Sequence, residues 1–150
     1  MNDLIEKLKQ TKIETLSYFD LSAELLNKTY DSNEWNVQYL LHHLADAETV
    51  LYDRIKRVIS EPKQVLWVFD QSLWAENLNY SQVPLVLSKN IYSSVREAII
   101  YYAEIHYEKN GQQEFVHSET GIRTLKEEFD KVAWHNQHHL AQIKQAISIG

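Results

Sequence analysis

The 150-residue sequence contains no cysteine, only three glycines and only two prolines. Without cysteine, the chain has no disulfide bond, no thiolate metal ligand and no thiol nucleophile of its own. The scarcity of glycine and proline argues against a turn-rich all-β fold, because tight turns and bulges depend on these residues. Any metal site in this chain must therefore use histidine, carboxylate or water ligands.

A net positive charge and long apolar runs are also missing. The formal net charge is −6, and nucleic-acid-binding proteins neutralise phosphates with lysine and arginine, so we expect no nucleic-acid partner. No apolar run approaches the roughly 20 residues of a membrane-spanning helix. The first ten residues, MNDLIEKLKQ, are charged and amphipathic and do not resemble a secretory signal. We expect a single cytoplasmic domain over residues 1–150, with no membrane partner.

Apolar residues recur at helical spacing in four segments, which predicts an all-α protein. The predicted helices cover residues 2 or 3 to 29, 35–59, 84–107 and 124–147. Asn33 is the predicted N-cap of the second helix. Thr124 and Glu127 form a capping-box pattern at the start of the fourth.

Two connections between these helices have features of their own. Residues 61–83 form a long crossover rich in aromatic residues, and a loop of this length usually has a function or packs on its own. Residues 109–123 contain GQQEFVHSETGIR, which favours a short β-hairpin with its turn at SETG. The predicted architecture is a four-helix bundle with one long crossover connection and a short β-hairpin before the last helix.

Five of the seven histidines fall in two clusters. The stretch AWHNQHHLAQI at 133–143 holds three of them, and LLHHLADAE at 40–48 holds two. Two histidines four residues apart on a helix project from one face and can take two corners of a tetrahedral metal centre. Such pairs also face water in many helices, so the clusters by themselves leave both interpretations open.

A helical wheel separates the members of each cluster. On the fourth predicted helix, His139 lies about 65° and His135 about 105° from the centre of the apolar stripe, whereas His138 lies about 165° away. On the second, His43 lies about 100° from the stripe centre and His42 about 160°. The wheel therefore predicts a metal site formed by one triad, His43, His135 and His139. The other two histidines are expected to point outward.

Several polar side chains near these clusters have competing interpretations. Gln142 is one turn from His139, so it either hydrogen-bonds a ligand histidine or a metal-bound water, or is an ordinary polar helix residue. Asp46 lies about 160° from the apolar stripe and is expected to be solvated or bonded locally, which leaves no evident general base. His117 lies in the predicted hairpin, where it can overhang the site.

Two further groups are expected to be structural unless the fold brings them to the site. His106, near the end of the third predicted helix, is expected to be structural or on the surface. Three aromatic residues, Trp74, Tyr80 and Trp134, either line a pocket or belong to the core.

Three stretches closely resemble the DinB/YfiT-like superfamily of metalloenzymes: WNVQYLLHHLADAE at 35–48, FVHSETG at 115–121 and AWHNQHHLAQI at 133–143. FDQSLWAE at 69–76, followed by NY at 79–80, is similar to the YfiT-like branch in particular. The resemblance covers nearly the whole chain. It implies a four-helix bundle that holds a divalent metal, commonly zinc or nickel, on His43, His135 and His139, completed by water. The last motif often ends in histidine in this branch, where this chain has Gln142, a departure that alters the surroundings of the site.

Three functions remain open at this point. Three neutral histidines plus water form an open, catalytic kind of metal site, whereas structural zinc sites are usually closed by four protein ligands. The resemblance implies a thiol S-transferase-type reaction on small electrophilic molecules, with a low-molecular-weight thiol as cosubstrate. A metal-dependent hydrolase that uses metal-activated water is the alternative. The third is a non-catalytic metal- or ligand-binding bundle, and the resemblance also implies a homodimer.

Overall fold

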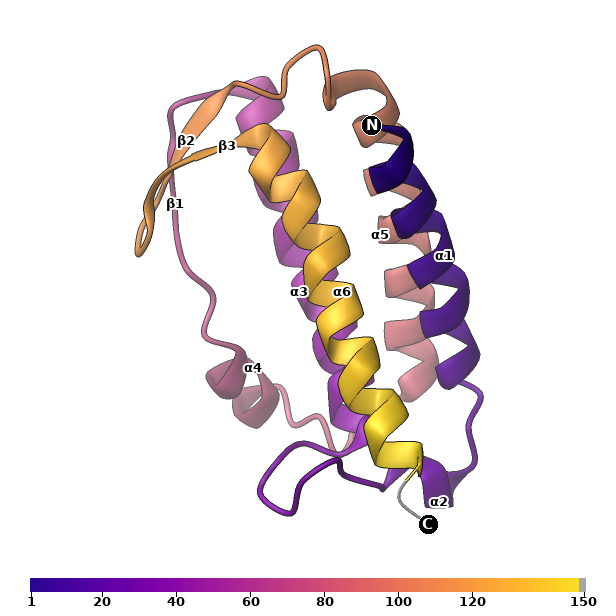
Figure 1. The fold of residues 1–150 in the computed structure, drawn as a ribbon. Coiled ribbons are helices and arrows are strands. Elements are labelled where there is room, and N and C mark those ends of the chain that lie inside the picture. The colour runs from indigo at the N-terminus through magenta and orange to yellow at the C-terminus, as the bar shows by residue number, and fades with distance from the viewer. Residues whose placement is uncertain (149–150) are drawn as a thin grey trace.

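The computed structural model describes residues 1–148, and the last two residues of the predicted domain lie outside the described part of the chain. Four long helices form a bundle (Figure 1): α1 (Asn2–Tyr18), α3 (Val37–Ser60), α5 (Leu85–His106) and α6 (Leu125–Ser148). Helices α3 and α1 each contact both α5 and α6. In Figure 1, α1 and α6 run in one direction and α3 and α5 in the other. Because the neighbours α3 and α5 are parallel, the chain between them must return along the bundle, which explains the long crossover.

The first helix is shorter than the sequence predicted. Helix α1 ends at Tyr18 and a separate short helix, α2 (Ala23–Leu26), follows, so the prediction of one helix over residues 2–29 is wrong. Ser22 has an extended backbone, and its hydroxyl accepts a hydrogen bond from the backbone N–H of Leu25 at 3.4 Å, which starts a new helix. Phe19 lies in the break and packs in the same apolar cluster as Leu26. Apolar periodicity therefore continues across the break and does not reveal it.

The starts of the other long helices depend on their capping residues. Asn36, and not the predicted Asn33, is the N-cap of α3, and its side-chain oxygen accepts a hydrogen bond from the backbone N–H of Tyr39 at 2.9 Å. The predicted capping box before α6 is confirmed. The backbone N–H of Thr124 donates to Glu127 at 2.8 Å, and the N–H of Glu127 donates to the Thr124 hydroxyl at 3.2 Å. Helix α5 lies within one residue of its predicted bounds.

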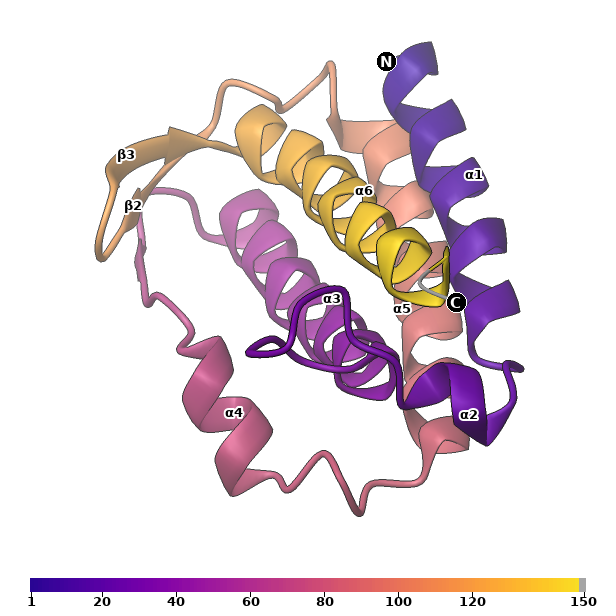
Figure 2. The same ribbon diagram turned by 60° about the horizontal axis from the view of Figure 1, so that its bottom comes forward.

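The crossover contains secondary structure of its own, β1 (Val65–Leu66) and α4 (Gln71–Asn77). Strand β1 pairs in parallel with β2 (Glu114–His117), which pairs antiparallel with β3 (Gly121–Thr124). The predicted hairpin is thus confirmed, while β1 is too short to show a strand pattern in the sequence. Figures 1 and 2 show the sheet and α4 on the side of the bundle formed by α3 and α6. The crossover and hairpin therefore lie on the side of the bundle formed by the two helices that carry the histidine clusters.

The core consists of two apolar clusters separated by a buried polar layer. Arg96 on α5 is fully buried and donates hydrogen bonds to Glu48 on α3, to Thr11 on α1 at 2.7 Å and to Asn136 on α6 at 2.6 Å. The amide of Asn136 donates to Thr15 at 2.9 Å. This layer ties all four long helices together at one level. Within residues 1–148, no helix combines the length and apolarity needed to cross a membrane.

Candidate metal centre

The structure brings together the three histidines that the wheel selected. His43 comes from α3, and His135 and His139 come from successive turns of the neighbouring α6. The Nε2 atom of His43 lies 3.0 Å from that of His135 and 3.1 Å from that of His139, and the last two are 3.1 Å apart. Among the described residues, these are the histidine, aspartate and glutamate side chains whose ligand atoms gather closely enough to hold a metal ion.

The three imidazoles are uncharged at neutral pH. Burial, and then the neighbouring His139, lowers the pKa of His43 to about 3. Burial, followed by the two neighbouring imidazoles, lowers the pKa of His135 to about 2. Burial also lowers the pKa of His139. Protonation therefore does not relieve the close approach of the three nitrogen lone pairs at neutral pH, whereas a bound metal cation would.

The donor set fits a divalent metal. Nitrogen ligands lie about 2.0–2.1 Å from zinc, so three nitrogens 3.0–3.1 Å apart can occupy three corners of a tetrahedron around one ion. Neutral imidazole is a suitable ligand for zinc and nickel. Three ligands leave one corner for water or substrate, which is the open arrangement of a catalytic site.

Gln142 orients one of the three imidazoles. Its side-chain oxygen lies 2.7 Å from Nδ1 of His139, and its amide nitrogen donates to the hydroxyl of Tyr30 at 3.1 Å. The amide oxygen can only accept, so Nδ1 of His139 carries the hydrogen and Nε2 keeps its lone pair. Of the two interpretations of Gln142, the structure selects the contact with a ligand-type histidine.

Aromatic rings cover the imidazole on α3. The ring of Phe69, in the crossover, stacks on His43 with centroids 6.0 Å apart and an interplanar angle of 9°. Trp35, in the connection between α2 and α3, approaches His43 with ring centroids 5.2 Å apart. Trp74 on α4 packs edge-on against Phe69 at 4.9 Å. The crossover therefore limits the access of water to this side of the centre.

The two remaining clustered histidines differ from one another. The prediction that His42 points outward is wrong, because it is only 1% exposed and its Nδ1 lies 2.6 Å from the hydroxyl of Ser88. Helix α5 and Tyr80 cover a second side of α3, which a wheel with one buried stripe does not represent. His138 is exposed as predicted and stacks on Trp134, which is 61% exposed and does not line the triad.

The carboxylates that follow His43 are committed to other partners. Asp46 accepts a hydrogen bond from the hydroxyl of Tyr80 at 2.5 Å, so it is bonded across the fold, and the expectation of solvent or a local partner is wrong. Glu48 pairs with Arg96 in the polar layer. Neither carboxylate is therefore free to act as a base.

Sequence reasoning missed the polar layer that supports the triad. Glu48 lies five residues after His43, and Asn136 directly follows His135, so both histidine-bearing helices are fixed in register through Arg96. One signal for it existed. Arg96 shares the inner face of its helix with Tyr92 and Ile99, where a positive charge needs a buried partner.

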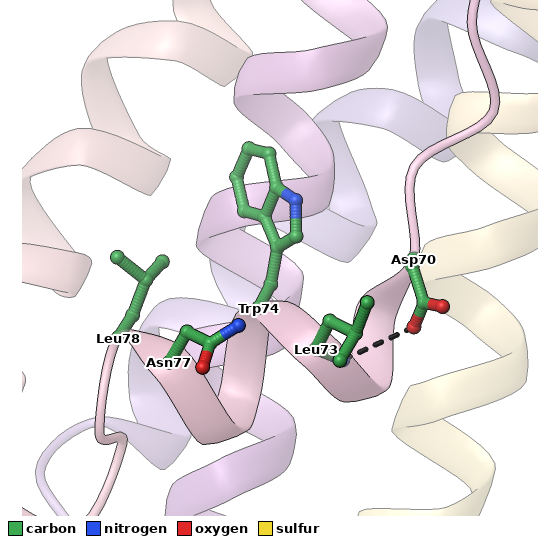
Figure 3. Close-up of a pocket in the computed structure, with 5 residues that line it drawn as sticks. All are labelled: Asp70, Leu73, Trp74, Asn77 and Leu78. Atoms are coloured by element: carbon green, nitrogen blue, oxygen red, sulfur yellow. Dashed lines mark hydrogen bonds between the residues drawn. The ribbon is translucent and has the colours of Figure 1, made fainter.

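A surface hollow lies on α4, and none of the three histidines lines it. It encloses about 440 Å³ and is lined by Asp70, Leu73, Trp74, Asn77 and Leu78. Figure 3 shows the indole of Trp74 standing up from α4 between the two leucines, with Asp70 capping the helix. Trp74 therefore lines a pocket, whereas Tyr80 is buried in the core.

Known proteins are similar to this chain in sequence and in fold. The profile of the DinB superfamily matches residues 7–143. A protein of Oceanobacillus iheyensis with the name "putative metal-dependent hydrolase" is 32% identical over 152 residues, covering 99% of this chain and 87% of its own length. One of Halalkalibacterium halodurans with the same kind of name is 31% identical over 122 residues, covering 81% of this chain and 71% of its own length.

The fold likeness extends to a solved structure. That structure is YfiT from Bacillus subtilis, described as a probable metal-dependent hydrolase with an unusual four-helix bundle topology. It matches with a TM-score of 0.86 over 97% of this chain and 84% of that chain, at 22% identity. With a bundle, a histidine triad and a family profile that agree over nearly its whole length, this chain belongs to the DinB superfamily.

Proposed function

We propose that this protein is a metal-dependent hydrolase of small molecules, with its metal held by His43, His135 and His139. The observation that carries the proposal is the convergence of three uncharged Nε2 atoms at mutual distances of 3.0–3.1 Å. Hydrolysis is favoured over thiol transfer because the relatives with the greatest similarity reported above are named as hydrolases. The thiol-transfer expectation rests on the resemblance alone.

The chain divides the work between ligands and supporting groups. His43, His135 and His139 would hold a zinc or nickel ion, which would supply Lewis-acid chemistry and lower the pKa of bound water towards 7. Gln142 holds the ring of His139 so that its Nε2 faces the centre. Phe69 and Trp35 cover His43 and limit water on that side. No free carboxylate base is required for such chemistry, which suits a site whose neighbouring carboxylates are already bonded.

The metal assignment is tested by elemental analysis of the purified protein. Wild type is expected to carry about one divalent ion per chain, and His43→Ala and His139→Ala are expected to lose it. His138→Ala is the matched control, because this exposed histidine lies on the same helix outside the triad. Equal metal content in wild type and all variants would contradict the assignment.

The reaction is tested with chromogenic esters and small electrophiles, with and without a panel of biological thiols. We expect turnover that requires metal, proceeds without thiol and is lost in His43→Ala. A product that carries the added thiol would replace hydrolysis with thiol transfer. If metal removal lowers the melting temperature and cobalt substitution reveals no exchangeable ligand, the bundle is a non-catalytic metal protein instead.

A further inference from the structure

A second cavity lies directly beside the triad, and His135 forms part of its wall. It encloses about 160 Å³ between α3, the crossover, β2 and α6. Leu51 and Phe69 contribute to an apolar side. The polar part of its wall is formed by three nitrogen-bearing side chains, Arg54, His117 and Lys131. A cavity that joins an apolar wall to several nitrogen groups is suited to a small ligand with a negatively charged end.

Lys131 is the unbalanced charge of this cavity. It lies one turn before His135 on α6 and is half-buried. Among residues 1–148, no side chain forms an ion pair or hydrogen bond with it, although Glu119 and Glu128 lie near enough to influence its charge. Burial lowers its pKa. A partly desolvated ammonium group without a partner is costly in the free protein, and a bound anion would relieve that cost.

Arg54 does not supply the same unbalanced charge. Its guanidinium pairs with the buried carboxylate of Glu128 at 3.4 Å and donates to the backbone oxygen of Trp67 at 2.8 Å. This pair neutralises Arg54 and fixes it in place against the crossover. The positive charge available to a ligand therefore belongs to Lys131.

His117 supplies a neutral donor to the same cavity. The backbone N–H groups of Glu119 and Thr120, in the hairpin turn, both donate to its Nδ1 at 3.2 Å. Nδ1 is thus the acceptor, so the neutral ring carries its hydrogen on Nε2. Burial, and then the charge of Arg54, lowers the pKa of His117, which keeps the ring in this neutral form. The hairpin turn therefore fixes which nitrogen donates.

We infer that this cavity binds the acidic group, a carboxylate or a phosphate, of the substrate, with Lys131 as its counterion and His117 as a hydrogen-bond donor. The volume is about five times the share of one water molecule in the liquid, so it admits a small acidic group. This inference rests on the proposed function only for the bond that is cleaved, which would lie at the triad. The substrate class is then a small molecule with an acidic end and a hydrolysable bond a few atoms away.

The binding test uses inorganic phosphate and succinate as probes, with neutral succinamide for comparison. Each is titrated calorimetrically into the metal-loaded wild type and into Lys131→Gln, Lys131→Arg and Lys126→Gln. We expect at least one of the two anions to bind the wild type and succinamide to bind far less. Lys131→Gln should weaken anion binding by about tenfold or more, because it removes a charge-assisted contact. Which of the two anions binds more tightly decides between carboxylate and phosphate.

The other variants and states decide whether the effect is local. Lys126→Gln removes the same charge from α6 outside the cavity, where Lys126 pairs with Glu108, and should bind as the wild type does. Lys131→Arg keeps the charge and should retain most of the affinity, and circular dichroism confirms that each variant is folded. Wild type stripped of metal by dialysis against a chelator should still bind the anion. Equal affinity in wild type and Lys131→Gln, no anion binding at all, or binding only when metal is present would each overturn the inference.

A turnover assay separates this inference from the proposed function. Matched esters that differ only in a terminal carboxylate or a terminal amide are compared in wild type and Lys131→Gln. We expect the acidic ester to have the higher kcat/KM, and Lys131→Gln to remove that preference by lowering the kcat/KM of the acidic ester. If no ester is hydrolysed but anion binding depends on Lys131, the proposed function fails and the binding site stands. If both esters are hydrolysed equally well by both proteins, the hydrolase stands and the inference fails.

Discussion

Gln142 holds His139 in one orientation, because its side-chain oxygen lies 2.7 Å from Nδ1 of the ring. The amide nitrogen of Gln142 is itself held by the hydroxyl of Tyr30 at 3.1 Å, in the connection that precedes α3. The direction in which His139 offers its lone pair is therefore set by a residue one turn further along α6 and by a distant loop. The consequences of this relationship, and of others in the bundle, are measurable.

Loss of the Gln142 contact should weaken metal binding without removing it. Partners that hydrogen-bond a ligand histidine typically contribute 10–100-fold in metal affinity, so Gln142→Ala is expected to lower affinity by about that factor. Competition with a chromophoric chelator measures the change. Gln137→Ala, an exposed glutamine on the same helix, is the control and should bind metal like the wild type. Unchanged affinity in Gln142→Ala would show that the contact does not orient the ring.

Breaking the buried ion pair between Glu48 and Arg96 should destabilise the whole bundle. Glu48→Gln leaves the fully buried guanidinium without its counterion, and such a change costs about 3–5 kcal/mol of unfolding free energy. Urea denaturation measures it. The control is Asp20→Asn, because Asp20 pairs with Lys89 near the surface and that change should cost no more than about 1 kcal/mol. Similar costs for the two variants would mean that the polar layer does not hold the helices in register.

The metal-free protein should lose stability as the pH falls below about 6.5. The pKa of His43 is about 3 and that of His135 about 2 in the folded state, whereas both would be near 6.5 in the unfolded chain. The unfolded state therefore binds more protons between these limits, and each histidine costs about 2 kcal/mol between pH 6.5 and pH 5. Stability is full above this window and lost progressively below it.

Urea denaturation of the metal-free protein at pH 7, 6 and 5 measures this loss. His135→Leu removes one of the titrating groups, so its stability should fall less steeply over the same pH range. His138→Leu, which changes an exposed histidine, should keep the slope of the wild type. Identical slopes in His135→Leu and wild type would contradict the assignment of low pKa values to the triad.

The bond between Tyr80 and Asp46 should anchor the crossover to α3. Tyr80 donates to Asp46 at 2.5 Å, and burial of Asp46 raises the pKa of its carboxyl group, an effect that this hydrogen bond partly offsets. Tyr80→Phe removes the donor and is expected to cost about 1–3 kcal/mol of unfolding free energy. In the background of Asp46→Asn the same substitution should cost less, so a double-mutant cycle measures the coupling. Additive effects would show that the two groups do not interact in solution.

Local sequence signals predicted the parts of the fold that depend on neighbouring residues. The capping box at Thr124 and Glu127 located the start of α6, because both hydrogen bonds lie within one turn. The hairpin was predicted for the same reason, since its turn and strands are consecutive in the chain. The break after Tyr18 escaped prediction because apolar residues continue through it and only the Ser22 cap marks the new helix.

The candidate site shows the same division. His43, His135 and His139 could be selected because a helix fixes the angular relation of its own residues. His42 could not be placed, because its burial comes from α5 and from Tyr80, which are distant in sequence. The roles of Gln142 and Arg96 also depend on contacts between helices, and a wheel drawn for one helix contains no information on them.

The sequence by itself determined the fold class, the last three of the four long helices, the hairpin and the identity of the histidine triad. Each of these follows from spacing, capping and composition along a continuous stretch of chain. The tertiary structure alone decided that three nitrogens from two helices meet within 3.1 Å, that Gln142 orients one of them and that Lys131, which has no ion-pair partner among residues 1–148, lines a cavity beside them. The physical reason is that the burial and pairing of a side chain depend on which helices pack together. That packing is decided by the apolar surface of all the helices at once, not by any one stretch of sequence.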